Sequence, residues 1–343
     1  MHKVTTIGLD LAKNVFQVHG ADADGATVFN RKLRRSEVLD FFERQPPCVV
    51  GIEACGTSHY WARCIAAFGH DVRLIHAPYV KAFVKRGKTD ANDAEAISEA
   101  AARKTMRFVP VKSADQQATI MTFNTRTLFV RQRAQATNAL RAHLAELGII
   151  AETGHASFKI LAATVRNLND THLPDAARAA LEEIVQQIEG LSERIERLDL
   201  AVVARTKEDE DARRLMTVPG VGPIVAAAVK SIAPNPSEFK SSRHFAAWIG
   251  LTPKPHSSGG RRLLGSISKA GNRQLRSLLY MAAVAVLGTV KDDGPAVRWS
   301  KRLRERRPFK VAAVAVANKL ARIIWALLVK GGVYTRAPQP REA

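Results

Sequence analysis

Short apolar runs alternate with amphipathic stretches along the first hundred residues. Residues 4–10, 14–19 and 27–29 are β-branched or alternating, and they predict three consecutive strands in an antiparallel meander. Residues 48–53 form a nearly continuous apolar run, typical of a strand buried on both faces. One more strand and three helices are expected, at residues 71–76 and at 36–43, 58–68 and 90–103. This order predicts a mixed sheet flanked by helices.

The middle of the chain has a helical pattern. Residues 113–147 carry apolar side chains at helical spacing, and residues 148–174 are less regular. A heptad-like seam then steps by threes and fours through Leu181, Ile184, Ile188, Leu191, Ile195 and Leu198. This seam is explained equally well by a helix packed on its own domain core and by a coiled coil between subunits.

The last third is predicted to be helical, with helices near residues 266–287 and 309–329. It opens with a Val-Pro-Gly-Val-Gly-Pro segment that resembles a helix-hairpin-helix turn. Gly220 and Gly222 permit positive φ, and the free N–H groups of the next helix could face a backbone phosphate. A tight helix corner without any ligand is the alternative.

The charge balance points to a polyanionic partner. The chain has 343 residues and carries 52 Lys and Arg against 32 Asp and Glu, a net charge of +20. Residues 240–310 hold sixteen of the basic residues and only three acids. One-sided enrichment favours a phosphate-binding face, and nucleic acid is favoured over an anionic membrane because neither end is a basic amphipathic helix. The candidate phosphate contacts here are Lys254, Arg261, Arg262, Lys269, Arg273 and Arg276.

Composition also restricts the compartment. The longest apolar stretch, residues 311–329, is interrupted by Asn318, Lys319 and Arg322, so we expect no membrane span. Asp10 falls where the apolar region of a signal peptide would run. Three irregularly spaced cysteines are too few for a disulfide scaffold or a zinc site. A cytoplasmic protein is expected.

Four carboxylates stand at positions where chemistry is possible, although each also has an ordinary structural explanation. Asp10 ends the first strand and could form an Asx turn. Glu53 ends an apolar strand, and burying a lone charge there is costly unless a partner or metal compensates. Asp90 could cap a helix, and Asp93 would then lie near the positive end of its dipole.

Taken together, these carboxylates predict a metal site. Asp10, Glu53, Asp90 and Asp93 can converge at one edge of the sheet. Hard oxygen ligands suit Mg²⁺ or Mn²⁺ and not zinc. Two such ions can stabilise the attacking and leaving oxygens when a phosphodiester is cleaved.

A Ser-Gly-rich loop at residues 250–262 presents hydroxyls beside glycine and arginine. Such loops are commonly flexible linkers, and a serine nucleophile needs a base, a metal or adjacent cations for activation. Arg261, Arg262 and Lys269 could supply positive charge to a transition state, and His256 is a candidate local base.

In combination, the motifs resemble the DEDD transposases of bacterial insertion sequences, the bridge-RNA-guided recombinases, over essentially the whole chain. The matching segments occur in the family's order: Gly8-Leu9-Asp10, Gly51-Ile52-Glu53-Ala54, residues 88–94, Pro219 to Pro223, Gly250 to Pro253, Ser258-Gly259, and Ile267 to Arg276. The resemblance implies an α/β plus α fold with four parts. These are an RNase H-like (RuvC-like) domain at 1–110, a helical coiled-coil connector at 111–207, a mostly helical transposase domain at 208–335 and a disordered tail at 336–343.

The resemblance also implies the roles of single residues. Asp10, Glu53, Asp90 and Asp93 would form the Mg²⁺ or Mn²⁺ site. Ser258, the serine directly before glycine, would be the nucleophile, with Ser257 beside it as the competing choice. Attack on DNA would give a phosphoserine link and a free 3′-hydroxyl, which conserves bond energy for rejoining.

The implied partners are donor and target DNA, an element-encoded non-coding RNA that delegates sequence choice to base pairing, and further copies of the chain, as a dimer that pairs into a tetramer. Arg126, Arg131, Arg133 and Arg141 would suit contacts to nucleic-acid backbones in the bacterial cytoplasm, at the nucleoid. Two alternatives remain: a metal-dependent nuclease that uses water as nucleophile, and a non-catalytic nucleic-acid-binding protein.

Overall fold

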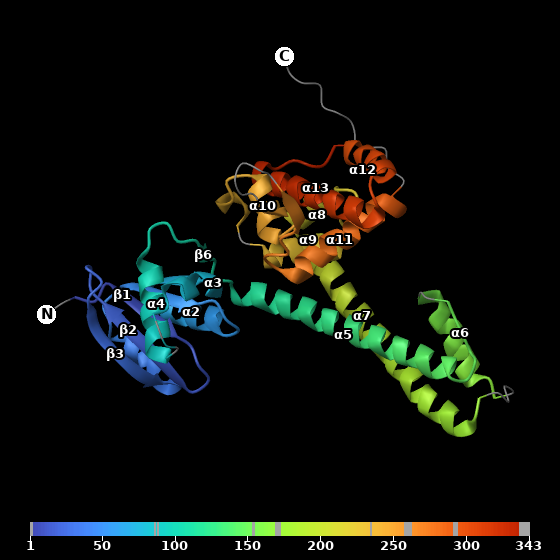
Figure 1. Cartoon of the computed structure of the whole chain (residues 1–343), viewed down its shortest axis with the longest axis horizontal. Coiled ribbons are helices and arrows are strands. Elements are labelled where there is room, and N and C mark those ends of the chain that lie inside the picture. The colour runs from blue at the N-terminus through green and yellow to red at the C-terminus, as the bar shows by residue number, and fades with distance from the viewer. Residues whose placement is uncertain are drawn as a thin grey trace, which may run out of the picture. The chain divides into compact units, whose positions relative to one another are not determined.

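The structure is a computed structural model that describes residues 3–85, 87, 89–152, 155–168, 173–233, 235–256, 263–290 and 294–335, with the backbone alone at 155 and 156. Contacts within the chain divide it into two units, Met1–Gln117 and Ala118–Ala343. The first is the mixed α/β unit drawn in blue to teal in Figure 1, and the second is almost entirely helical. The division falls in the first turn of helix α5 (Ala114–Ala145).

A six-stranded sheet in the order β3-β2-β1-β4-β5-β6 forms the N-terminal unit. Its strands are β1 (Thr6–Asp10), β2 (Val15–Ala21), β3 (Thr27–Arg34), β4 (Val49–Glu53), β5 (Asp71–Ile75) and β6 (Phe108–Val109). Strands β1 to β3 are antiparallel neighbours, β1, β4 and β5 are parallel, and β6 is antiparallel to β5. The predicted meander and mixed sheet are confirmed, and β3 extends five residues beyond the expected strand.

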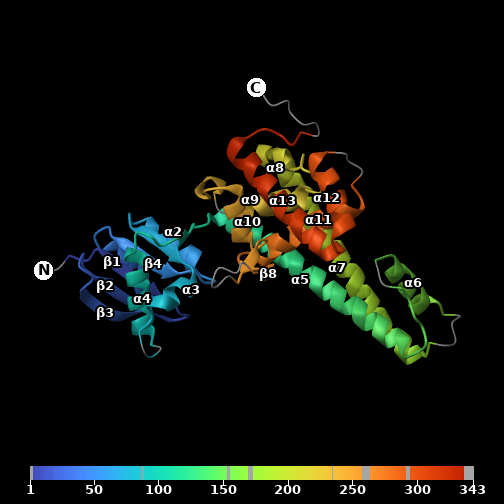
Figure 2. The same ribbon diagram turned by 45° about the horizontal axis from the view of Figure 1, so that its top comes forward.

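The two faces of this sheet carry different helices. Alternate residues of β1, β2 and β4 pack under α1 (Val38–Glu43) and α2 (Ser58–Ala66), with Phe16, Phe42 and Trp61 among the core residues. Helix α4 (Asp90–Ala102) lies across the other face, as both views show (Figures 1 and 2). Short helical segments complete the unit at Arg35–Glu37, Ala77–Val80 and Lys81–Phe83.

Two glycines let α4 lie directly on the sheet backbone. A Cβ atom added at Gly8 on β1 would lie 2.0 Å from the carbonyl oxygen of Ala94, and one at Gly51 on β4 would lie 2.6 Å from the Cβ of Ala101. No side chain fits in that space, because packed interiors leave no gaps of this size. The close approach fixes where the first turn of α4 lies relative to the ends of β1 and β4.

The C-terminal unit begins with a long antiparallel helix pair. Helix α5 pairs with α7 (Asp175–Glu208), and α6 (His155–Arg166) packs beside them. The expected irregularity of residues 148–174 is therefore wrong at α6, whose Leu161 and Val165 are buried against the pair. The first half of the predicted seam, including Leu181 and Ile188, packs on α5 and α6 of the same chain.

The remaining helices surround α13 (Phe309–Lys330). They are α8 (Glu210–Leu215), α9 (Pro223–Ile232), α10 (Ser242–Ile249), α11 (Arg273–Gly288) and α12 (Pro295–Arg306), with a short turn at Pro236–Glu238 and a hairpin of β7 (Pro253–Pro255) and β8 (Leu264–Ile267). The helix expected from residue 266 starts later, because Asn272 caps α11 by accepting a hydrogen bond from the Leu275 amide at 2.9 Å. Helix α13 has the length and apolarity of a membrane span, but one side of it is the centre of this core.

Candidate active site

The four candidate carboxylates come from three elements that meet at one end of the sheet. Asp10 ends β1 and Glu53 ends β4, and these parallel neighbours therefore present both residues at the same edge. Side chains alternate along a strand, so Asp10 and Glu53 lie on the face of Gly8 and Gly51, which is the α4 face. Asp90 and Asp93 lie in the first turn of α4.

The prediction that Asp90 caps helix α4 is wrong, because the helix already begins at Asp90. Thr89 is the N-cap, and its hydroxyl accepts a hydrogen bond from the Asn92 amide at 3.2 Å. Asp90 is thereby the first helical residue and not the cap. Asp90 is exposed and Asp93 is half-buried, so both carboxylates remain accessible beside the positive end of the helix dipole.

The other three carboxylates act electrostatically on Asp10. Burial and then the negative charges of Asp93, Asp90 and Glu53 raise the pKa of Asp10 to about 6. The hydrogen bond from the Leu11 amide opposes this shift only in part. Like charges held together near a buried carboxylate destabilise one another unless a cation compensates.

The donor set fits a hard divalent cation in chemistry, although the side chains do not yet enclose one. Among the residues that the structure describes, no three acidic, histidine or cysteine side chains form a ready-made metal cage. A donor set of carboxylate oxygens alone matches the ligands that Mg²⁺ or Mn²⁺ prefers, and a bound cation would favour the ionised form of Asp10. Binding would need the side chains to move toward a shared ion.

Two buried polar side chains lie beside Asp10 and were missed from the sequence. Gln17 is opposite Asp10 in the β1–β2 ladder and 5% exposed, and its Nε2 donates to Asn30. His19, 3% exposed, is opposite Gly8, and burial lowers its pKa against the opposing effect of Glu95. Within the described chain, Gln17 Oε1 and His19 Nδ1 have no hydrogen-bond partner. Polar residues at alternate positions of an otherwise apolar strand were the available signal.

The serine loop is described only at its base. Ser257, Ser258, Arg261 and Arg262 lie outside the described residues. Strands β7 and β8 support the loop, and the His256 amide donates to the Leu263 carbonyl at 2.9 Å. Lys254 and His256 are exposed on this hairpin.

The arginines of α5 are largely engaged within the chain. Arg126 forms a bidentate ion pair with Asp199 on α7. Arg133 donates to the Ser192 hydroxyl at 3.4 Å, and Arg141 donates to the Ser157 hydroxyl at 2.8 Å. Arg131 is exposed. Three of these four candidates therefore hold helix α5 to α7 and α6, and these helices are here named the α5–α7 arm.

The basic candidates after the hairpin also divide into two kinds. Lys269 and Arg273 are exposed. Arg276 donates to the carbonyl oxygens of Ile249 and Ala270 at 2.8 and 2.6 Å, which holds α11 to the end of α10. Lys269 and Arg273 are thus placed for an external partner, and Arg276 has a structural role.

The glycine turn between α8 and α9 has a packing explanation. Gly220 has a φ of 78°, and an added Cβ would lie 2.5 Å from the Ala282 carbonyl oxygen on α11. Gly222 is the N-cap of α9 and has open space around it. Only Gly220 is required by the fold.

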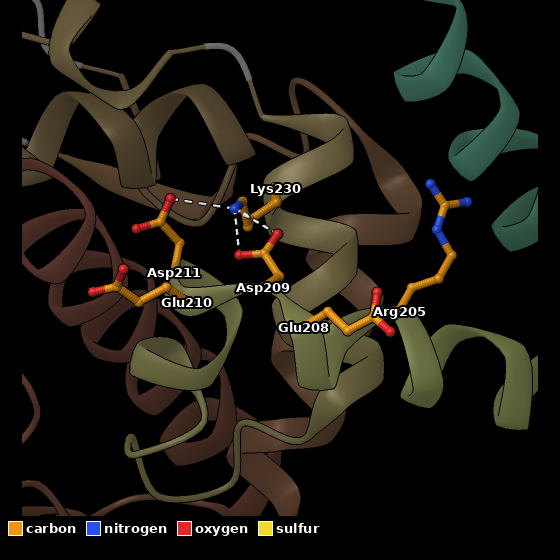
Figure 3. A pocket seen from close by; sticks show the side chains of 6 residues that line it. All are labelled: Arg205, Glu208, Asp209, Glu210, Asp211 and Lys230. Atoms are coloured by element: carbon orange, nitrogen blue, oxygen red, sulfur yellow. Dashed lines mark hydrogen bonds and ion pairs between the residues drawn. The ribbon is translucent and has the colours of Figure 1, made fainter.

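A charged depression at the junction of α7 and α8, beside the last turns of α9, is a structural ion cluster (Figure 3). Lys230 of α9 lies between two carboxylates, 2.5 Å from Asp209 and 3.2 Å from Asp211, while Arg205 and Glu210 point away from it. Burial raises the pKa of Asp209, but the hydrogen bonds and charge of Lys230 together with the hydrogen bonds from the Ala212 and Asp211 amides outweigh it, and the net pKa is below its usual range. The cluster fixes α9 against the junction of α7 and α8.

Comparison with known proteins gives matches to both ends of the chain. Residues 7–149 match the DEDD transposase family of IS110, and residues 212–297 match the transposase family IS116/IS110/IS902. The DEDD domain suggests a divalent metal cofactor.

Relatives are similar over the full length. A protein of Pseudomonas aeruginosa named "Probable family 20 transposase" is 46% identical over 96% of this chain and 98% of its own length. The "Transposase for insertion sequence element IS1328" of Yersinia enterocolitica is 37% identical over 98% of this chain and 100% of its own. The "Pilin gene-inverting protein" of Moraxella bovis is 26% identical over 94% and 95%.

Proposed function

The chain belongs to the IS116/IS110/IS902 family of transposases, enzymes that act on DNA, and we propose that it cuts and rejoins DNA strands through a serine nucleophile beside a carboxylate-bound divalent metal. This membership confirms the family resemblance drawn from the sequence motifs. One observation carries the proposal: α4 lies directly on the sheet at Gly8 and Gly51, and the charges of Asp93, Asp90 and Glu53 act on Asp10.

In this proposal, Asp10, Glu53, Asp90 and Asp93 hold Mg²⁺ or Mn²⁺. When bound, the ions supply positive charge that stabilises the oxygens of a phosphodiester under attack. Asp10 and Glu53 are held rigidly by the sheet, and Asp90 and Asp93 complete the set from α4. The meander followed by parallel strands supports an RNase H-like, RuvC-like assignment of this unit.

Ser258 is the proposed nucleophile. Its oxygen attacks the phosphorus, the bond from phosphorus to the 3′-oxygen breaks, and the leaving oxygen takes up a proton to become a 3′-hydroxyl. The product is a phosphoserine ester that the hydroxyl of another strand can attack in reverse. Arg261, Arg262 and Lys269 would stabilise the charge on phosphorus, and His256 is the candidate base.

The family resemblance also supports an RNA guide and an assembly of dimers into a tetramer. Base pairing by an element-encoded RNA would choose the sites, and the protein would bind backbones. Exposed cations such as Arg131, Lys254, Lys269 and Arg273 suit that task. The exposed part of the α5–α7 arm is the candidate assembly element.

Metal binding is tested by thermal unfolding with the metal alone. A ligand that binds only the native state at one hundred times its dissociation constant stabilises it by about 2.7 kcal/mol. Mg²⁺ or Mn²⁺ should raise the melting temperature of the wild type and of Glu43→Gln, an exposed acid of α1, but not of Asp10→Asn. An equal rise in all three proteins would disprove the carboxylate site.

The nucleophile is tested by trapping a covalent protein–DNA adduct with cognate DNA, RNA and Mg²⁺. The adduct should be absent in Ser258→Ala and present in Ser257→Ala. The reverse result would move the nucleophile by one residue. Cleavage without any adduct, insensitive to both substitutions, would instead establish a nuclease that uses water.

A further inference from the structure

We propose that a cleft at the carboxyl edge of the N-terminal sheet binds the backbone phosphates of the DNA strand that enters the carboxylate site. The cleft, here named the arginine cleft, has a volume of about 720 Å³ and is lined by Asn14, Arg34, Arg35, Ser36, Tyr60 and Trp61 together with apolar neighbours. The inference rests on the proposed function, because it assumes that a phosphodiester is cleaved at Asp10 and its neighbours.

The cleft opens at the same end of the sheet as the carboxylates. Arg35 and Trp61 lie on the α1–α2 face and Asp10 lies on the α4 face, so a strand that contacts both sites passes around the end of the sheet. Asp10 is opposite Gln17 on β2, and two residues nearer the start of β2, Val15 pairs with Arg34 of β3. The Arg35 amide donates to the Asn14 carbonyl at 2.9 Å, which closes this corner. With strands about 4.8 Å apart and about 3.3 Å per residue, the Cα atoms of Asp10 and Arg34 are about 12 Å apart. At a rise of about 3.4 Å per nucleotide along a duplex, that distance corresponds to roughly three to four nucleotides.

Aromatic rings hold one of the two arginines without neutralising it. The Arg35 guanidinium lies 5.0 Å from the ring centre of Trp61 and 5.8 Å from that of Phe16. Such contacts fix the position of a cation and leave its hydrogen-bond donors for another group. A planar guanidinium with free donors matches the geometry of a phosphate.

None of the described residues that line the cleft is acidic, and the nearby Glu37 accepts a hydrogen bond from the backbone amide of Arg34 at 2.7 Å. Arg73 differs, because Asp71 is its ion-pair partner at 2.6 Å. Among the described residues, the side chains of Arg34 and Arg35 have no carboxylate within ion-pair distance. The cleft therefore concentrates positive charge at the same end of the sheet as a site whose own charge is negative.

Two aromatic side chains of the cleft differ in their exposure. Trp61 is 3% exposed, and its Nε1 donor has no partner in the described part of the chain. Tyr60, next to it, is 48% exposed although it is a large aromatic residue. The indole nitrogen is itself buried, so the contribution to ligand binding comes from the exposed Tyr60 ring at the rim, which can stack on a base.

Binding to single-stranded DNA tests the proposal in the full-length protein without metal, so that no cleavage is required. Fluorescence anisotropy with a labelled 20-nucleotide strand should show that the dissociation constant of the double variant Arg34→Ala/Arg35→Ala is at least tenfold higher than that of the wild type. The slope of log K against log salt should be shallower by about 1.4, since each lost phosphate contact contributes about 0.7 for single strands. Arg44→Ala, an exposed arginine just after α1, should match the wild type.

One more variant and a melting measurement guard against an effect on folding. Arg35→Lys keeps the charge and should keep the salt slope, and all variants should melt within a few degrees of the wild type. An unchanged slope in the double variant would overturn the arginine cleft while leaving the metal and serine tests untouched. A loss confined to an RNA strand of the same sequence would overturn the assignment to DNA.

Discussion

The two units of this protein differ in how their charged residues are arranged: acids are clustered in the first, and cations are dispersed in the second. The N-terminal unit carries 17 Lys and Arg against 13 Asp and Glu, and the C-terminal unit carries 35 against 19. In the first, acidic groups from distant segments are brought together by strands that share an edge and by a helix in contact with backbone. In the second, cations are spread over helices, and many of them pair within the chain.

This difference matches two physical demands. A metal site requires several ligands at fixed positions, so its residues belong on rigid elements whose spacing is set by backbone contact. Binding a polyanion requires charge over an area and tolerates displacement of single side chains. The carboxylate edge should therefore be far more sensitive to small changes of backbone packing than the basic surfaces are.

The strongest test of that sensitivity is Gly8→Ala. The new methyl group would meet the carbonyl oxygen of Ala94 at 2.0 Å, so α4 must move away from the sheet. We expect a loss of about 3 kcal/mol or more in the free energy of unfolding, measured in urea, and loss of the Mg²⁺-dependent rise in melting temperature. Gly56→Ala, where nothing lies within 4 Å of the added atom, should leave both quantities unchanged. If Gly8→Ala kept the Mg²⁺-dependent rise in melting temperature, metal binding by the carboxylates would not depend on the close packing of α4 against the sheet.

The corresponding change in the C-terminal unit is Gly220→Ala. A positive φ of 78° and an approach of 2.5 Å to the Ala282 carbonyl oxygen predict a loss of about 2–3 kcal/mol in urea unfolding. The Mg²⁺ effect should persist, because the substitution does not touch the carboxylates. Gly222→Ala, in open space, should cost less than about 1 kcal/mol. Loss of the Mg²⁺ effect in Gly220→Ala would show that the two units are coupled.

The ion cluster at Lys230 predicts a smaller effect. Lys230→Met would leave Asp209 and Asp211 without their shared cation, and we expect a loss of about 1–2 kcal/mol in the free energy of unfolding. The loss should shrink at high salt, because the pair is partly exposed. Lys330→Met at the exposed end of α13 is the matched control. Equal free energies of unfolding for Lys230→Met and Lys330→Met would show that the ion cluster does not stabilise the fold.

The sequence predicted more of the first unit than of the second. Period-two alternation and β-branched runs located β1, β2, β4 and β5, because a strand half or wholly buried in a sheet determines its own pattern. Helix α6 and the late start of α11 were missed, because tertiary packing and the Asn272 cap, and not periodicity, decide them. Asp10 and Glu53 could be assigned to one edge from strand order alone. The contact of α4 with Gly8 and Gly51, and the arginine cleft, required side chains placed in three dimensions.

Protonation of His59 at acid pH should lower the free energy of unfolding of the N-terminal unit. The Lys112 amide donates to His59 Nδ1 at 3.2 Å, and the Lys112 ammonium lies 3.0 Å from Nε2, so α2 holds the chain leading into α5. Burial, and then the charges of Lys112 and Arg63, lower the pKa of His59 to about 4. A doubly protonated ring cannot accept the Lys112 amide, so charging it breaks the contact.

The sign of the effect follows from this lowered pKa. The unfolded chain takes up the proton near pH 6.5 and the folded chain only near pH 4, so the stabilisation by His59 is complete above pH 6.5 and is lost toward pH 4. Because the ring is partly exposed, about 1 kcal/mol is expected. Asp10 opposes this trend, since its raised pKa favours the folded state as it takes up a proton below pH 6. The measurement is therefore the difference in unfolding free energy between wild type and His59→Gln at pH 7 and pH 4.5. That difference should narrow at the lower pH, and a constant difference would show that the ring charges without disturbing the contact.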